Sequence, residues 1–164
     1  MTREQILEQV AAHGCPLVEL TGGEPLLQPG AFPLLTELCD AGYEVLVETG
    51  GGVDISAVDP RVRRILDVKC PASGESQANH WPNLEVLRPT DELKFVVADE
   101  NDYRWAIDLV RSRNLSEVCP IHISPVHGTV DLQALAGWIL QDRLPIRLQL
   151  QMHKLVWSPE TRGV

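Results

Sequence analysis

The chain has 164 residues, of which 44% are hydrophobic and 23% are charged, and its formal net charge is −9. This length allows a single domain with a sizeable core, and the composition is ordinary for a globular protein. The negative charge argues against non-specific nucleic-acid binding, which needs Lys and Arg to displace counterions. No apolar run approaches the roughly 20 residues that span a bilayer, and the first residues contain no signal region. We therefore expect no membrane association and a cytoplasmic location.

The four cysteines are far apart in the sequence, at Cys15, Cys39, Cys70 and Cys119. No disulfide framework is implied for an intracellular chain. Zinc sites need closely spaced ligands, and no single loop could supply three thiolates to an iron–sulfur cluster. We therefore expect packing thiols, no metal ligands, and no cluster bound by this chain alone.

Helical and strand patterns alternate along the first half of the chain. Thr2 and Gln5 form a capping box before an apolar helical face, and Gly14 is placed to end that helix. The next elements expected in chain order are a strand at 17–21, a helix at 32–39, strands at 43–47 and 65–68, a loop-rich segment at 71–89 and a strand at 93–97.

The second half continues the alternation. Asp99 is placed to cap a helix that carries Tyr103 and Val110, and a strand follows at 121–123. Thr129 or Asp131 could cap the last helix, and 146–150 is the last expected strand. This order predicts one α/β domain over residues 1–164, with about six mainly parallel strands. An open partial barrel is favoured over a closed eight-fold barrel, which typically needs about 250 residues.

The opening of the chain is unusual for such a fold. An α/β unit normally begins with a strand, whereas this sequence begins with a helix. Either a first strand is missing upstream, or the helix covers one edge of the sheet.

Glycine and polar residues follow successive expected strands. The carboxyl ends of parallel strands meet at one rim, where ligands bind α/β sheets. We therefore expect a pocket for a polar, zwitterionic ligand at this rim. The segments concerned are Thr21-Gly22-Gly23-Glu24-Pro25, Glu48-Thr49-Gly50-Gly51-Gly52, Lys69-Cys70-Pro71, Ser124-Pro125 and Gln151-Met152-His153-Lys154.

Each of these residues also has a structural interpretation. The two glycines before Glu24 allow close approach of a ligand, and the carboxylate could bind an ammonium group. They equally fit a tight turn with an acid near a helix start. Three glycines favour a turn, Lys69 alone favours a solvated pair with Asp67, and a lone histidine such as His153 is more often structural.

Taken in order, these segments resemble the 7-carboxy-7-deazaguanine synthase family of radical S-adenosylmethionine (SAM) enzymes. The GGEP motif at 22–25 is typical of the superfamily, and Glu48-Thr49 followed by glycines resembles the family segment Glu-Thr-Asn-Gly-Thr. The other matching segments are Asp67-Val68-Lys69-Cys70-Pro71 with Ser73-Gly74, Asp91-Glu92-Leu93-Lys94-Phe95-Val96, Ser124-Pro125 and Leu148-Gln149-Leu150-Gln151-Met152-His153-Lys154.

The resemblance implies a radical SAM lyase that converts 6-carboxy-5,6,7,8-tetrahydropterin to 7-carboxy-7-deazaguanine, on the way to queuosine and related bases. It implies SAM, a [4Fe-4S] cluster and Mg²⁺ as cofactors, and a homodimer. The SAM-binding residues it implies are Gly22, Gly23, Glu24, Glu48, Asp67, Val68, Lys69, Ser124 and Pro125. The substrate-binding residues it implies are Thr21, Thr49 and His153.

The chain departs from the family pattern in two ways. The family has three clustered cysteines and a magnesium-binding Thr upstream of GGEP, but only 21 residues precede Gly22 here, with Cys15 as their sole cysteine. Gly50 also stands where the family has Asn. We therefore expect a sequence that is incomplete at its N-terminus and inactive without a cluster-binding segment. Either Met1 is an internal methionine mistaken for the start, or the front of the chain has been lost.

Two other functions remain as alternatives. The first is a non-catalytic remnant that still binds SAM or the pterin. The second is a generic nucleotide-binding α/β protein, which would need a phosphate-binding pattern such as GxGxxG or GxxxxGK[ST]. Neither pattern occurs in the sequence.

Overall fold

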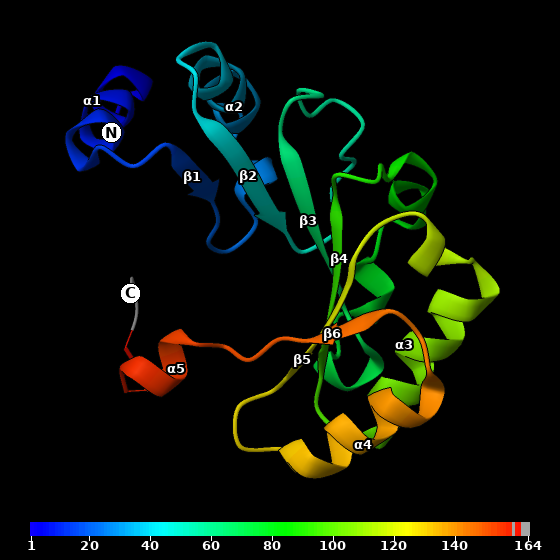
Figure 1. Ribbon diagram of the computed structural model, residues 1–164. Helices are drawn as coiled ribbons and strands as arrows, with labels where there is room; N and C mark the ends of the chain where they lie inside the picture. The colour runs from blue at the N-terminus through cyan, green and yellow to red at the C-terminus, as the bar shows by residue number, and fades with distance from the viewer. Residues whose placement is uncertain (159, 162–164) are drawn as a thin grey trace.

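The computed structural model describes residues 1–158, 160 and 161, and these form a sheet of six parallel strands (Figure 1). The strands are β1 (Leu17–Leu20), β2 (Glu44–Thr49), β3 (Arg63–Val68), β4 (Glu92–Val97), β5 (Ile121–Pro125) and β6 (Ile146–Leu148). They are paired in chain order, and all five pairings are parallel. The predicted α/β fold with about six parallel strands is confirmed.

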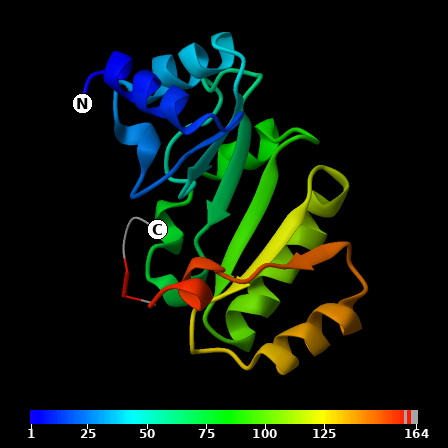
Figure 2. The same ribbon diagram turned by 60° about the vertical axis from the view of Figure 1, so that its left-hand side comes forward.

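The sheet curves into an arc whose two edges, β1 and β6, do not meet (Figure 1). The helices are α1 (Arg3–His13), α2 (Ala31–Asp40), α3 (Glu100–Ser112), α4 (Leu132–Asp142) and α5 (His153–Val156). The first four lie on the outer side of the arc, whereas α5 lies on its open side in both views (Figures 1 and 2). This arrangement is the open partial barrel expected from the sequence.

The helix boundaries follow from local capping. Thr2 accepts a hydrogen bond from the Gln5 backbone N–H, the Gln5 side chain accepts one from Thr2 N–H, and Gly14 ends α1 in the left-handed conformation. Asp99 caps α3 through the Asp102 N–H, as predicted. Of the two candidate caps for α4, Asp131 is the one observed.

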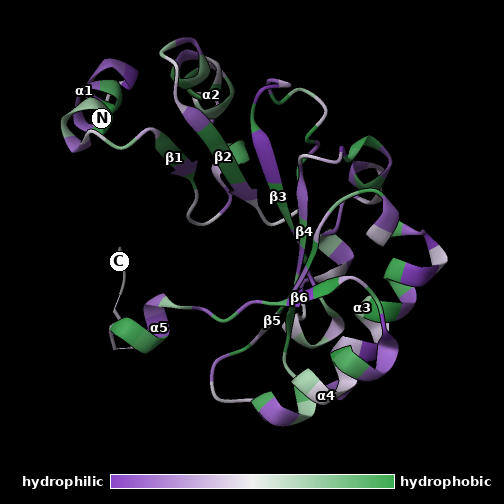
Figure 3. Cartoon of the chain, in the orientation of Figure 1, coloured by the Kyte–Doolittle hydropathy of each residue, from purple (hydrophilic) through white to green (hydrophobic). Residues whose placement is uncertain are grey.

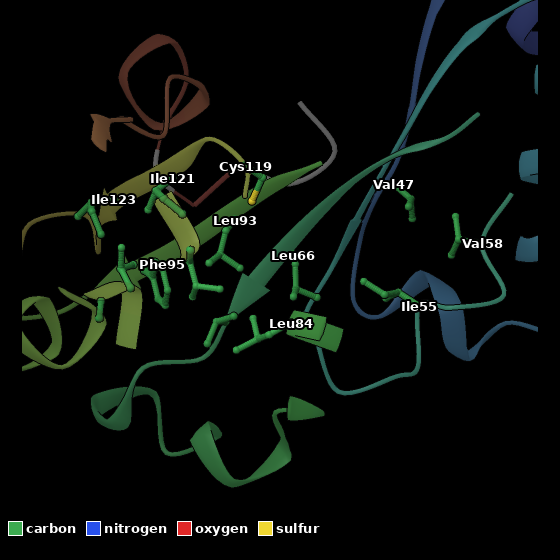
Figure 4. Close-up of a cluster of buried hydrophobic side chains, with 14 of the residues drawn as sticks. Val47, Ile55, Val58, Leu66, Leu84, Leu93, Phe95, Cys119, Ile121 and Ile123 are labelled. Carbon is green, nitrogen blue, oxygen red and sulfur yellow. The ribbon is translucent and has the colours of Figure 1, made fainter. Parts of the chain in front are cut away.

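The main core lies between the outer face of the sheet and the helices. Alternate strand residues such as Val47, Leu66 and Phe95 are buried there (Figure 4). Fully burying one such side chain stabilises the fold by about 1.5–3 kcal/mol. Figure 3 shows hydrophobic and hydrophilic bands alternating around α3 and α4, as expected for helices with one buried side. The opposite, concave face of the sheet is thereby left for polar groups.

Two expectations about local structure are corrected. The segment 71–89, expected as a loop, contains three short 3-10 helices: η2 (Pro71–Ser73), η3 (Ser76–Ala78) and η4 (Trp81–Val86). Side-chain amides hold it in place, because Asn79 binds both the N–H and the C=O of Lys69, and Asn83 binds Ile55 N–H.

The last strand ends at Leu148 rather than at residue 150. His153 is therefore not at a strand end but begins α5. No helix among the described residues has the length and apolar character needed to cross a membrane.

Candidate functional site

Glu24 is held by donors from its own turn and from the neighbouring strand end. Its Oε1 accepts a hydrogen bond from the backbone N–H of Leu26 at 3.0 Å, at the start of η1 (Pro25–Leu27). Its Oε2 accepts from Thr49 Oγ1 and from the Gly50 N–H, both at 2.8 Å. A carboxylate offers about four lone-pair sites, so one remains for a further donor.

The glycines around Glu24 make this geometry possible. Gly22 and Gly23 have φ angles of 99° and 55°, and Gly51 has a φ of 76°. Residues with a Cβ atom are strained at such positive φ angles, whereas glycine adopts them without strain. The tight-turn interpretation therefore accounts for the glycine pair and for the Glu24–Leu26 bond, and it leaves the carboxylate in a fixed position.

Gly50 separates Glu24 from Lys69. A Cβ atom added to Gly50 would lie 3.3 Å from Lys69 Cε and 3.4 Å from Glu24 Oε2. The end of the Lys69 side chain therefore occupies the space beside residue 50, where the family pattern has Asn. Glu24 and Lys69 thus lie on the same rim, and the charge of Lys69 is near the Glu24 carboxylate.

Asp67 links Lys69 to a hollow of about 430 Å³. Lys69 Nζ donates to Asp67 Oδ2 at 2.7 Å, whereas the buried Asp67 Oδ1 has no hydrogen-bond partner. Both residues line the hollow, together with Val96 and Gln151. Asp67 therefore has one oxygen committed to Lys69 and one available to a ligand.

Two further buried side-chain oxygens near this hollow have no hydrogen-bond partner. Ser124 is only 1% exposed, and its Oγ makes no hydrogen bond. Ser124 lies beside Val96, its partner in the β4–β5 register. Gln151 Oε1 is also buried and unpartnered. Native proteins leave few buried polar groups without a partner, so each such group needs an explanation. A bound polar ligand would supply the missing partners.

An ion pair crosses the concave face below this hollow. Lys94 Nζ donates to Glu48 Oε1 at 2.7 Å, although β3 lies between their strands. Glu19 on β1 is close to Glu48, and its pKa is raised, first by burial and then by the negative charge of Glu48. The concave face therefore carries charged groups that are largely paired with one another.

His122 lies on the same face, as the register partner of Lys94. Its Nε2 is 3.0 Å from Glu92 Oε2, but neither ring nitrogen makes a hydrogen bond. Burial lowers the pKa of His122 in spite of the opposing charge of Glu92. His127 is exposed in the loop after β5. The described residues contain no group of three or more His, Cys, Asp or Glu that could hold a metal ion.

The remaining candidate residues occupy varied positions. Thr49 is fully buried and is used to hold Glu24, and Val68 is part of the core. Thr21 is exposed and lines a hollow between α1 and α2, and Pro125 is buried at the end of β5. His153 is exposed on α5. Glu24, Asp67, Lys69 and Ser124 are thus the predicted residues that the fold gathers at the strand ends.

Curated relatives of the chain are named 7-carboxy-7-deazaguanine synthase. The chain is 47% identical to the 7-carboxy-7-deazaguanine synthase of Chlorobaculum tepidum, in an alignment of 167 residues that covers 100% of this chain and 76% of the relative. It is 44% identical to that of Koribacter versatilis, over 90% of this chain and 72% of the relative. The chain belongs to the 7-carboxy-7-deazaguanine synthase family. No protein-family model matches the sequence.

Solved structures show the same fold at low identity. A crystal structure of QueE from Escherichia coli has a TM-score of 0.66 and 20% identity, over 92% of this chain and 64% of that one. A crystal structure of Streptococcus suis SuiB bound to S-adenosylmethionine has a TM-score of 0.62 and 12% identity, over 90% of this chain and 40% of that one. The chain thus spans about three quarters of the length of these two relatives and less than two thirds of the solved QueE chain.

The described cysteines of this family member do not fit an iron–sulfur cluster. Cys15 is exposed ahead of β1, whereas Cys70 and Cys119 are buried at opposite ends of their strands. Burial raises the pKa of the Cys119 thiol to about 11 and that of Cys70 higher still. A cluster needs several cysteine thiolates close together, and these cysteines lie on separate elements of the fold.

Several residues that shape the site were not identified from the sequence. Asn79 and Asn83 fix the segment that packs over the glycine loop, where Asn83 Nδ2 donates to Gly51 O at 3.3 Å. Asp102 binds the N–H groups of Ala72 and Ala98 at the border of the hollow. Asparagine in a Pro- and Ser-rich segment indicates only a turn, so the sequence carried little signal for these roles.

Proposed function

We propose that this chain belongs to an enzyme that binds SAM and 6-carboxy-5,6,7,8-tetrahydropterin, and rearranges the pterin to 7-carboxy-7-deazaguanine with loss of ammonia. Family membership supports the reaction. The observation that supports the ligand site is the set of buried, unpartnered oxygens of Asp67, Ser124 and Gln151 beside Glu24 and Lys69. They are acceptors without donors, at the end of the sheet where α/β folds bind ligands.

The proposed roles on the SAM side follow from the free lone pairs. Glu24 would accept a hydrogen bond from the methionyl ammonium through its remaining site, in the turn formed by Gly22 and Gly23. Asp67 Oδ1 would accept from a ribose hydroxyl, and Ser124 Oγ would accept or donate. Lys69 would orient Asp67 through its hydrogen bond to Oδ2, which leaves Oδ1 for the ligand.

The other residues implied by the resemblance are given narrower roles. The backbone of Val68 and the ring of Pro125 would form walls of the SAM site, and Glu48 would face the bound ligands with Lys94 as its counter-ion. Thr49 would act through Glu24, because its hydroxyl donates to that carboxylate. Thr21 and His153 would contact the pterin from the strand end and from α5.

SAM would supply the radical chemistry of the reaction, and Glu24, Asp67 and Ser124 would hold it at the rim. The cysteines described here do not fit the cluster that cleaves it, so this chain's own contribution is to bind and orient. We include in the proposal Mg²⁺ as a further cofactor, a cytoplasmic location and a homodimer. The exposed apolar side chains of Met152, Leu155 and Val156 on and before α5 support the homodimer.

A non-catalytic SAM- or pterin-binding protein is the second candidate. The burial of Cys70 and Cys119 favours it, because these thiols are not available as ligands. The enzyme and a SAM-binding remnant require the same SAM site and differ in whether product forms, whereas a remnant that binds only the pterin does not require that site.

Calorimetric titration of the chain with SAM tests the site. We expect Asp67→Asn and Ser124→Ala to weaken binding by about fivefold each, because each removes one buried hydrogen-bond partner worth about 1 kcal/mol. Asp108→Asn, a change at an exposed position of α3, serves as the control and should bind SAM as the wild type does. Unchanged affinity in both site variants would contradict the site.

Reading the DNA upstream of Met1 separates the two candidates. An in-frame segment with three closely spaced cysteines supports the enzyme, and a stop codon there supports the non-catalytic protein.

A further inference from the structure

Gln151 joins two hollows at the rim. It lines the hollow of about 430 Å³ that contains Asp67 and Lys69. It also lines a second hollow of about 200 Å³ beside the loop that follows β5. Val126 is the other residue common to both. A ligand that occupies both hollows must therefore pass the Gln151 side chain.

The second hollow differs from the first in its chemistry. Its walls are mainly apolar, and are formed by Pro125, Val126, Val130, Leu132, Leu150 and Leu155. Among the charged residue types only His127 contributes to it, and that residue is exposed. Such walls suit the faces of a flat heterocycle, whereas the carboxylate of a carboxypterin would be buried there without a cation, which is costly.

The backbone on both sides of Gln151 is anchored, so the side chain starts from a fixed position at this boundary. Gln149 N–H donates to Ile123 O at 2.9 Å, and Lys154 N–H donates to Gln151 O at 3.0 Å. The side-chain Oε1 is buried and has no hydrogen-bond partner. It is an acceptor that needs an N–H or O–H donor at the inner edge of an apolar hollow.

From this arrangement we infer that Gln151 is a specificity-determining residue whose amide recognises the 6-amino group of the adenine ring of SAM. Oε1 accepts a hydrogen bond from that amino group, and Nε2 donates to an adjacent ring nitrogen. Glutamine and adenine are matched for this two-bond contact, which also reads adenine in DNA. The inference rests on the proposed function, because it assumes that SAM occupies the rim.

The test compares S-adenosyl-L-homocysteine with its 6-deamino analogue, which keeps the purine but lacks the amino group. Calorimetry on the wild-type chain should show about five- to tenfold tighter binding of S-adenosyl-L-homocysteine, since one buried acceptor loses its donor in the analogue. Gln151→Leu, which is similar in size, should bind both ligands equally. Gln141→Leu, at an exposed position of α4, should keep the wild-type preference.

Gln151→Glu keeps an acceptor at the same place and should also bind S-adenosyl-L-homocysteine more tightly than its 6-deamino analogue. This variant provides a second test if Gln151→Leu misfolds. Equal affinities of the wild type for the two ligands would overturn the inference, and so would a preference that persists in Gln151→Leu. Absence of binding of both ligands to the wild type would overturn the proposed SAM site itself, and this inference with it.

Discussion

Replacing Glu24 by Gln should destabilise the fold as well as weaken ligand binding. In the wild type, Oε2 accepts from Thr49 Oγ1 and Gly50 N–H, and Oε1 accepts from Leu26 N–H. An amide has only one acceptor atom. Either orientation of the Gln side chain therefore places its NH₂ group against at least one backbone N–H.

The magnitude follows from these three contacts. Leaving the Leu26 N–H without a partner costs about 1–3 kcal/mol, and the two other bonds lose the charge of their acceptor. We expect the free energy of unfolding to fall by about 2–3 kcal/mol. For a chain of this size that corresponds to a Tm lower by roughly 4–12 °C. SAM affinity should fall roughly tenfold, because the ammonium loses a charged acceptor.

Urea unfolding and differential scanning calorimetry measure the first effect, and calorimetric titration measures the second. Glu8→Gln is the matched control, because Glu8 is exposed on α1, and it should change stability by no more than about 0.5 kcal/mol. A Glu24→Gln variant as stable as this control would show that the carboxylate does not hold the two loops together.

Three further predictions address the charge network, the substrate and the cluster. Burial raises the pKa of Asp91, but hydrogen bonds from Arg64 and Arg88 outweigh it and leave the pKa lowered. Ionised Asp91 therefore stabilises the fold fully above its unfolded-state pKa near 3.9, and this stabilisation is lost as the pH falls through its lower folded-state pKa. Asp91→Asn should cost about 3–5 kcal/mol at pH 7, and a stability gap that stays constant down to pH 3 in urea unfolding would contradict this. His153→Ala should weaken binding of the pterin but not of SAM, and calorimetry showing equal SAM losses in His153→Ala and Glu24→Gln would reject the assignment. Anaerobic reconstitution of the chain should give no stoichiometric cluster by iron and sulfide analysis. A stoichiometric cluster whose EPR signal changes on addition of SAM would contradict this.

The sequence predicted best those features that depend on neighbouring residues. The capping box of Thr2 and Gln5, the Asp99 cap and the apolar strands were identified because each has a local pattern. The rim was predictable for the same reason, since strand ends are local and their convergence follows from the parallel sheet. Glu24 could therefore be placed on the strand-end rim from its position after β1.

Features that depend on register or on long-range contact were not predictable in this way. The Lys94–Glu48 pair spans β3, so finding it requires the alignment of three strands. The burial of Thr49 depends on its facing the helices rather than the concave side. Gln151 was noticed only as a residue after the last strand, because its unpartnered oxygen depends on where the chain runs beyond β6.

A crystal structure of the chain with SAM would show whether the rim binds this ligand. We expect SAM at the rim, with its ammonium at Glu24, its ribose at Asp67 and Ser124, and its adenine between Gln151 and the apolar walls near Val126. SAM bound on the outer, helix-covered side of the sheet, or at the rim with Asp67 Oδ1 and Ser124 Oγ still without partners, would contradict this expectation.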